Sequence, residues 1–176
     1  MLSPPTTEPP IVNRVAQSGI VTLNLEAYYP NNEAILFDLK DYLFMGLILK
    51  EKDFREALTK HDWTQYQGKN IAITCSANAI IPLWAYMLVA NYLTQYANYF
   101  AVVANTQVLT DLIFIQNLSQ QINPETYRDK RVVVKGCGDK TIPAAAFAEI
   151  TRLLQPVVKT LMYGEPCSTV PIYKQK

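Results

Sequence analysis

Three cysteines, Cys75, Cys137 and Cys167, are the side chains of this sequence best suited to chemistry. Each lies at an apparent loop and is followed by serine or glycine. Small neighbours allow backbone N–H groups to approach a ligand closely, and a helix N-terminus lowers the pKa of a nearby thiol toward the reactive thiolate. A single free cysteine often only fills a gap in the core, but this recurrence at three loops favours a chemical role.

Two of these cysteines lie in similar segments. Residues 131–143 pass from a β-branched run through Gly136-Cys137-Gly138 to Ile142-Pro143, and residues 71–82 pass from a β-run through Cys75 to Ile81-Pro82. Each segment therefore predicts a strand, a cysteine loop and a helix. In open parallel sheets ligands bind at the carboxyl ends of the strands, which is where both thiols are expected.

The residues leave three chemical interpretations open. In the first, Cys75, Cys137 and Cys167 bind zinc or an iron–sulfur cluster, with Asp139 or Glu165 as a fourth ligand. In the second, Cys137 or Cys75 carries a persulfide in a loop lined by N–H groups. In the third, one of these two cysteines is the catalytic nucleophile of a thiol enzyme with an unknown substrate. A fourth reading has no chemistry: a dimeric scaffold with structural cysteines.

Known cysteine motifs do not decide between these interpretations. A rhodanese-like loop and a cysteine phosphatase both need an arginine, but Ile81 and Pro143 occupy the phosphatase position six residues after each cysteine. The only histidine, His61, follows a helical segment, where a protonated imidazole would favour the helix dipole. We therefore expect His61 to be an exposed cap and not a catalytic base.

Hydrophobic periodicity predicts the elements that would position the cysteines. Strands are expected at Ile20–Leu25, Ala34–Phe37, Asn70–Thr74, Tyr99–Ala104 and Arg131–Lys135, and helices at 47–60, 80–93, 105–120 and from Pro143 to a C-cap at Gly164. A strand at Leu112–Ile115 is the alternative within the third helix. This order predicts an α/β fold: a three-layer sandwich with a mainly parallel sheet and repeated strand–cysteine loop–helix units. The first two strands are predicted to form an antiparallel pair at one edge.

The last predicted helix affects the position of Cys167. Its apolar residues recur every three or four positions from Phe147 to Leu161, with Pro156 expected to kink or divide the helix and Gly164 expected as the C-cap. An unbroken helix would end near the amino end of the sheet, too far away for Cys167 to join the other thiols. Either Pro156 turns the chain back, or Cys167 has a separate role, or it meets the others across a homodimer. The wholly apolar helix 80–93 favours the homodimer.

The composition of the chain indicates the broad class of protein. The 176 residues are 49% hydrophobic and 18% charged, with a net charge of +1, which predicts a globular protein without a nucleic-acid-binding surface. Residues 1–10 carry four prolines and predict a flexible lead-in, and residues 11–176 predict a single α/β domain. Neither a signal peptide nor a membrane span is evident, so a cytoplasmic location is expected.

Several segments resemble a bacterial family known as domain of unknown function 2480, found mainly in the Bacteroidetes. The residues that carry the resemblance are Leu36–Leu43, Glu51–Arg55, His61–Trp63, Thr74–Ser76, Ile81–Pro82, Trp84–Leu88, Val134–Cys137 and Met162–Pro171. Asn78 departs from the family, where aspartate is expected. Because members are often encoded near genes for sulfur mobilisation and iron–sulfur assembly, the resemblance implies partners among those proteins. It favours the sulfur and metal interpretations.

Overall fold

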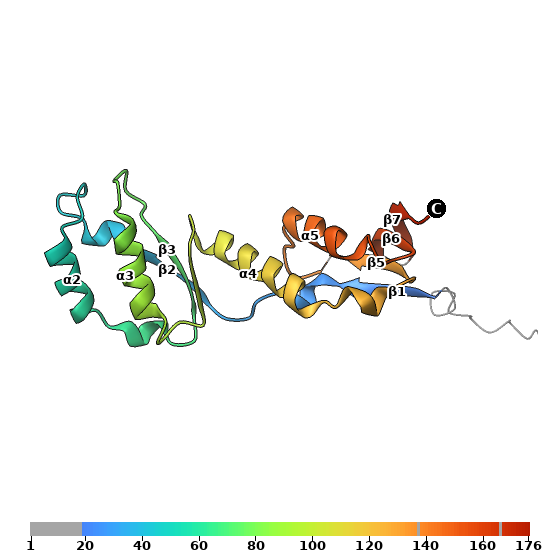
Figure 1. The fold of residues 1–176 in the computed structure, drawn as a ribbon, viewed down its shortest axis with the longest axis horizontal. Helices are drawn as coiled ribbons and strands as arrows, with labels where there is room; N and C mark the ends of the chain where they lie inside the picture. The colour runs from blue at the N-terminus through green and yellow to red at the C-terminus, as the bar shows by residue number, and fades with distance from the viewer. Residues whose placement is uncertain (1–18, 137, 166) are drawn as a thin grey trace, which may run out of the picture. The chain divides into compact units, whose positions relative to one another are not determined.

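The computed structural model describes residues 19–136, 138–165 and 167–176, which form a mixed α/β fold with two mostly parallel sheets (Figure 1). The strands are β1 (Ile20–Asn24), β2 (Ala34–Asp38), β3 (Asn70–Thr74), β4 (Tyr99–Val102), β5 (Arg131–Lys135), β6 (Thr160–Glu165) and β7 (Ser168–Lys174). The α-helices are α2 (Glu51–Lys60), α3 (Leu83–Leu93), α4 (Thr106–Gln121) and α5 (Ala144–Leu154). Short 3-10 helices are η1 (Leu25–Tyr28), η2 (Leu39–Tyr42), η3 (Trp63–Tyr66) and η4 (Pro124–Tyr127). The predicted α/β class is confirmed.

The chain divides into two compact units. Unit 1 contains the described residues of 19–27 and Ser119–Lys176, and unit 2 contains Tyr28–Leu118. The boundary falls within α4. Each unit is built around one of the two sheets.

Sheet A, in unit 1, has the strand order β1-β5-β6-β7. The first three strands are parallel, with Val21 opposite Val132 and Val132 opposite Leu161. Strand β7 is antiparallel to β6. The central valines of β5 are fully or almost fully buried, as are Ile150 and Leu154 of α5, because β-branched residues of a central strand pack well against a helix.

Sheet B, in unit 2, has the order β2-β3-β4, and all of its pairs are parallel. Its main core combines Phe37, Ile71 and Ile73 of the sheet with Phe54 and Leu58 of α2 and with Ala85, Val89 and Leu93 of α3. A smaller cluster joins Ala72 to Leu109 and Ile113 of α4. Because successive strand residues point to opposite faces, Ile71 and Ile73 pack with one cluster and Ala72 with the other.

The predicted antiparallel pair at the N-terminus is wrong. Strand β1 pairs in parallel with β5, whereas β2 pairs in parallel with β3 of the other sheet. The connection from β1 to β2 is not a tight turn: η1 intervenes, and its first residue, Leu25, is fully buried. A hairpin needs a short turn between its strands, and this longer, anchored segment allows each strand to take a different partner.

The last predicted helix is also wrong beyond Leu154. Helix α5 ends there, two residues before Pro156, and the chain continues into β6. Proline lacks the N–H that the next helical turn requires, and it ends this helix instead of kinking it. Gly164 is not a C-cap but a residue of β6 with φ of 121°, opposite Thr169. A Cβ at this position would lie 2.5 Å from the Ser168 carbonyl oxygen, so the hairpin requires glycine.

Several predictions stay untested. The proline-rich lead-in, residues 1–10, lies outside the described residues, and the single domain from residue 11 stays a prediction. Among the helices that the structure describes, none is long and apolar enough to cross a membrane.

Candidate functional site

The carboxyl end of sheet A carries an ion pair and, at the following turn, an exposed thiol. Lys135 ends β5, Glu165 ends the neighbouring strand β6, and the Lys135 ammonium lies 3.1 Å from the Glu165 carboxylate. Because Glu165 pairs with Ser168, the residue before Ser168 lies at the turn between β6 and β7. That residue is Cys167, an exposed free cysteine. The length argument applied to an unbroken helix; α5 ends before Pro156 and β6 brings the chain back to this edge, which is the first of the three alternatives.

The loop after β5 is held from two sides. Gly136 lies against the Phe147 ring of α5, and Gly138 lies against the Glu26 carboxylate, so closely that a Cβ on either glycine would overlap those groups. The Glu26 carboxylate also accepts a hydrogen bond from the Lys140 backbone N–H at 2.7 Å. The sequence predicts that the small residue after Cys137, Gly138, allows backbone N–H groups to approach a ligand, but the Glu26 carboxylate occupies the space beside Gly138, as the Phe147 ring does beside Gly136.

Glu26 is a site residue that the sequence interpretation missed. It lies in η1, directly after β1, and therefore at the same edge as the loop after β5, because β1 and β5 are parallel neighbours. Its backbone N–H donates a hydrogen bond to the Asn24 side-chain oxygen at 3.2 Å. The separation of 114 residues between Glu26 and Lys140 leaves no local signal in the sequence.

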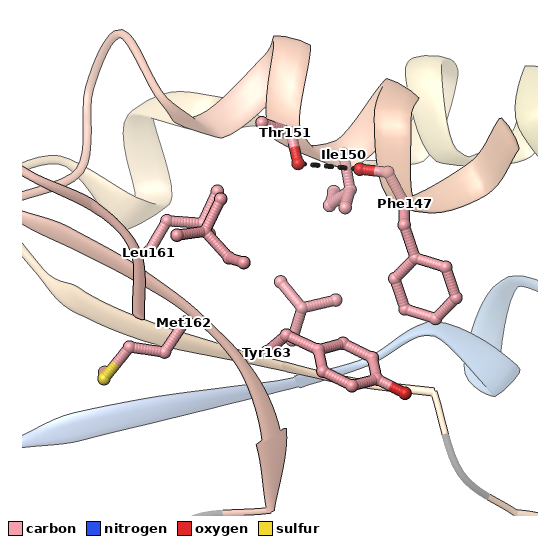
Figure 2. Close-up of a pocket in the computed structure, with 8 residues that line it drawn as sticks. Phe147, Ile150, Thr151, Leu161, Met162 and Tyr163 are labelled. Carbon is pink, nitrogen blue, oxygen red and sulfur yellow. Dashed lines mark hydrogen bonds between the residues drawn. The ribbon is translucent and has the colours of Figure 1, made fainter. Parts of the chain in front are cut away.

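A cavity of about 220 Å³ lies between α5 and the strands of sheet A (Figure 2). It is lined by Val134, Phe147, Ile150, Thr151, Leu161, Met162, Tyr163 and Ile172. The Thr151 hydroxyl donates to the Phe147 carbonyl at 2.7 Å, and the rings of Phe147 and Tyr163 meet nearly at right angles, 5.4 Å apart. With its threonine hydroxyl engaged, this mostly apolar cavity suits a small uncharged group and offers no metal ligands.

The carboxyl end of sheet B holds Cys75. Asp38, at the end of β2, accepts hydrogen bonds at 3.0 Å from the backbone N–H groups of Lys40 and Ser76. Burial, the largest effect, raises the pKa of Asp38, but hydrogen bonds from Ser76 and Lys40 together hold that pKa below its usual value. Asp38 therefore ties the loop after β3 to the end of β2, which fixes the backbone next to Cys75.

The Cys75 thiol is half-buried and has no catalytic base among its described contacts. Its sulfur lies 3.7 Å from the Ala77 carbonyl oxygen and packs against the main core of unit 2. Burial, with a smaller contribution from Cys75, raises the pKa of the Tyr86 phenol, which stays protonated near neutral pH. These surroundings suit a thiol that fills space beside the core as well as they suit a reactive thiol.

His61 is the C-cap residue of α2, as expected, and its backbone N–H donates to the Leu58 carbonyl at 3.4 Å, but its imidazole is neither fully exposed nor favoured in the protonated form. Its Nδ1 lies 3.1 Å from the Tyr42 hydroxyl and its Nε2 lies 3.0 Å from the Tyr66 hydroxyl. Phe37 and Trp63 contact the ring edge-on. Burial lowers the pKa of His61 and raises that of Tyr66 to about 12. The exposed, protonated ring was the wrong part of the expectation, because Phe37 and Tyr42, which are distant in the sequence, enclose the imidazole together with its neighbours Trp63 and Tyr66. Both of the imidazole nitrogens already have partners.

The structure describes two of the three predicted metal ligands. Cys75 belongs to unit 2 and Cys167 to unit 1, while Cys137 lies outside the described residues. Within the described part of the chain, no three histidine, cysteine, aspartate or glutamate side chains are grouped closely enough to hold a metal ion. The site with three thiols stays a prediction, as does the catalytic role of Cys75 and Cys137.

The helices and the two mostly parallel sheets define the chain as a mixed α/β protein. The chain belongs to the family described as "Protein of unknown function (DUF2480)", whose model matches residues 9–175. Neither the curated proteins nor the solved structures contain a significant match to it.

Proposed function

We propose that the protein is an accessory of sulfur or iron–sulfur metabolism that uses Cys137 and Cys167 to hold a thiophilic group. The observation that supports this most is the return of β6 beside β5, which brings the turn with Cys167 to the edge where the loop after β5 begins. Gly136 and Gly138, which flank Cys137 in the chain, contact Phe147 and Glu26 of the same unit. Two thiols on neighbouring loops are the minimum for a shared thiophilic ligand.

Two kinds of cargo fit such a pair. A zinc ion or an iron–sulfur cluster would take the two thiolates as ligands, and Glu165, Asp139 or a cysteine of a partner would complete the set. Glu165 is already paired with Lys135, so its carboxylate would have to exchange that partner for the metal.

The second kind of cargo is sulfane sulfur. A partner persulfide, R–S–SH, would be attacked at its outer sulfur by the thiolate of Cys137 or Cys167. The new S–S bond leaves a cysteine persulfide here and releases the partner as R–S⁻, so that no external oxidant is required. Sulfur-mobilising and iron–sulfur assembly proteins are the partners that this chemistry needs.

The surroundings of Cys75 favour a structural role for this residue. Its half-buried sulfur belongs to the core of unit 2, and the imidazole of His61 is already bonded to two phenols. A thiol enzyme based on Cys75 would lack the adjacent base that activates such nucleophiles. We therefore assign Cys75 a structural role and use it as the reference cysteine in experiments.

The test is anaerobic purification of the protein and of three variants, Cys75→Ser, Cys137→Ser and Cys167→Ser, followed by assays for metal, acid-labile sulfide and persulfide. We expect cargo in the wild type and in Cys75→Ser, and its loss from both of the other variants. A wild type without metal, labile sulfide or persulfide after incubation with zinc, iron and a persulfide donor would overturn the proposal. Loss confined to Cys75→Ser would also contradict it.

A further inference from the structure

The carboxyl end of sheet B carries a group of large apolar side chains that nothing in unit 2 covers. We call these six side chains the apolar edge. Three come from the segment before α2, namely Met45, Leu47 and Ile48. The other three come from the segment before α3 and from its first two turns, namely Ile80, Leu83 and Met87. Ile80 is 94% exposed, Met45 82% and Leu83 80%, and the other three are between 60% and 73% exposed. Monomeric proteins expose such residues singly but rarely in groups.

The two halves of the apolar edge are neighbours in the fold. Strands β2 and β3 are parallel and paired up to Asp38 and Thr74, so the segments that follow them leave sheet B on the same side. The first turns of α2 and α3 meet where the rings of Phe54 and Trp84 lie 6.1 Å apart. In Figure 1 the segments that lead into α2 and α3 lie at the same end of these helices.

The tip of the first segment is held in a conformation that suits its side chain poorly. Met45 has a φ of 53° and Gly46 a φ of 71°, in a turn closed by the pairing of Phe44 with Ile48. Glycine or asparagine is usual at such positions, and methionine is strained there. A strained, exposed methionine gives the isolated unit no stability, but it would contribute apolar contact to an interface.

Charge indicates what covers this surface. Residues 70–110, which include the second half of the apolar edge, contain no charged side chain. A surface that binds membranes combines apolar residues with an excess of lysine and arginine. The second half of the edge has neither, and beside the first half Lys50 and Lys52 alternate with Glu51 and Asp53. The centres of homodimer interfaces, in contrast, are depleted of charge, with charged residues at the rim. Lys50, which lies over the Phe44 ring at 3.2 Å, and Asp53 are placed as such a rim beside the first segment.

From these observations we infer that the apolar edge is the interface of a homodimer, in which the edge of one copy packs against the same edge of a second copy. The six residues together expose on the order of 800 Å² of surface, which is comparable with what each partner buries in a standard interface. A two-fold dimer is the simplest assembly that covers one self-complementary patch on every copy. The inference does not depend on the thiol chemistry proposed for unit 1.

The test is sedimentation velocity of the full chain under reducing conditions over a wide range of concentrations, with the variants Leu83→Glu and Met87→Glu. We expect the wild type at twice the 19.9 kDa mass of the chain. Each variant should weaken the dimer at least about a hundredfold, because it would bury an unpaired charge. Val170→Glu is the matched control, since Val170 is a 58% exposed apolar residue of β7 in unit 1, and it should stay dimeric.

Two further measurements separate a lost interface from a lost fold. Met45→Gly suits the positive φ, so it should raise or preserve thermal stability while weakening the dimer severalfold. An equal mixture of Leu83→Glu and Leu83→Lys should associate better than either alone, because in a two-fold interface the same patch meets itself. A wild type that is monomeric at every concentration would overturn the inference. So would a dimer that Leu83→Glu, Met87→Glu and Met45→Gly all leave intact.

Discussion

The side chains of Lys135 and Glu165 form an ion pair of 3.1 Å that joins the carboxyl ends of the adjacent parallel strands β5 and β6. The pair is partly exposed, with 34% and 39% of the two side chains accessible, so its contribution to stability is modest. Its position matters more than its energy, because both chain segments that leave this edge lead to a cysteine.

Removing this pair should cost little stability. We expect Lys135→Met and Glu165→Gln each to lower the free energy of unfolding by less than about 1 kcal/mol, as for other partly exposed pairs. The double variant should cost less than the sum of the two, because both changes remove the same interaction. Urea denaturation of the four proteins measures this, and strict additivity would show that the two side chains do not interact in solution.

The glycines around residue 137 should differ in their tolerance of a methyl group. Gly136→Ala is expected to lower the free energy of unfolding by about 1–3 kcal/mol, because its Cβ would overlap the packed Phe147 ring. Gly138→Ala should cost less, since the Glu26 carboxylate that it meets is the end of a flexible side chain. Thermal or urea denaturation compares the two. Adding Phe147→Leu should recover part of the loss in Gly136→Ala, and no recovery would count against this packing.

The link between Asp38 and Ser76 can be tested with matched substitutions. Asp38→Ala should lower the free energy of unfolding by about 1–3 kcal/mol, because it leaves the N–H groups of Lys40 and Ser76 without their acceptor. Asp38→Asn keeps an acceptor oxygen and should cost less. Alkylation of Cys75 by iodoacetamide should also be faster in Asp38→Ala, as its loop loosens. Equal stability and equal alkylation rates in both variants would contradict the proposed link.

The pH dependence of stability should reveal His61. Burial lowers the pKa of His61 in the folded chain below its usual 6.5, so in that range the unfolded chain binds more protons. The stability from the neutral imidazole is therefore complete above the unfolded pKa and is lost as the pH falls below it. Because the chain has one histidine, urea denaturation between pH 7 and pH 5 should show this decline in the wild type and much less of it in His61→Gln. Stability that rises as the pH falls over this range would contradict the prediction.

Local patterns were enough to predict most of the strands and the α/β class. The β-branched run at Arg131–Lys135 and the apolar run at Asn70–Thr74 form the central strands of the two sheets, because only buried strands suit such sequences. The partners of the strands could not be predicted. Nothing local to Ile20–Asn24 or Ala34–Asp38 states that they belong to different sheets, since strand pairing is decided by contacts between distant segments.

The candidate site, like the fold, could be predicted from local patterns only in part. The sequence indicated Cys137 and Cys167, but periodicity at Leu161 fitted a helix as well as a strand, so the position of Cys167 stayed open. Pro156 was the local signal for a return of the chain, and α5 ends two residues before it. Glu26, in contrast, reaches Lys140 across the fold, and His61 depends on Tyr42 and Tyr66 for its surroundings. Such groups are recognised only once the chain is folded.

The most direct test of the thiol pair is titration of the reduced protein with phenylarsine oxide, a trivalent arsenical that bonds two thiols held close together. We predict tight binding of one arsenical per chain in the wild type and in Cys75→Ser. Cys137→Ser and Cys167→Ser should each abolish tight binding, because one remaining thiol cannot chelate the arsenic. Wild-type protein without tight binding, or tight binding that survives in Cys137→Ser or Cys167→Ser, would contradict the central proposal.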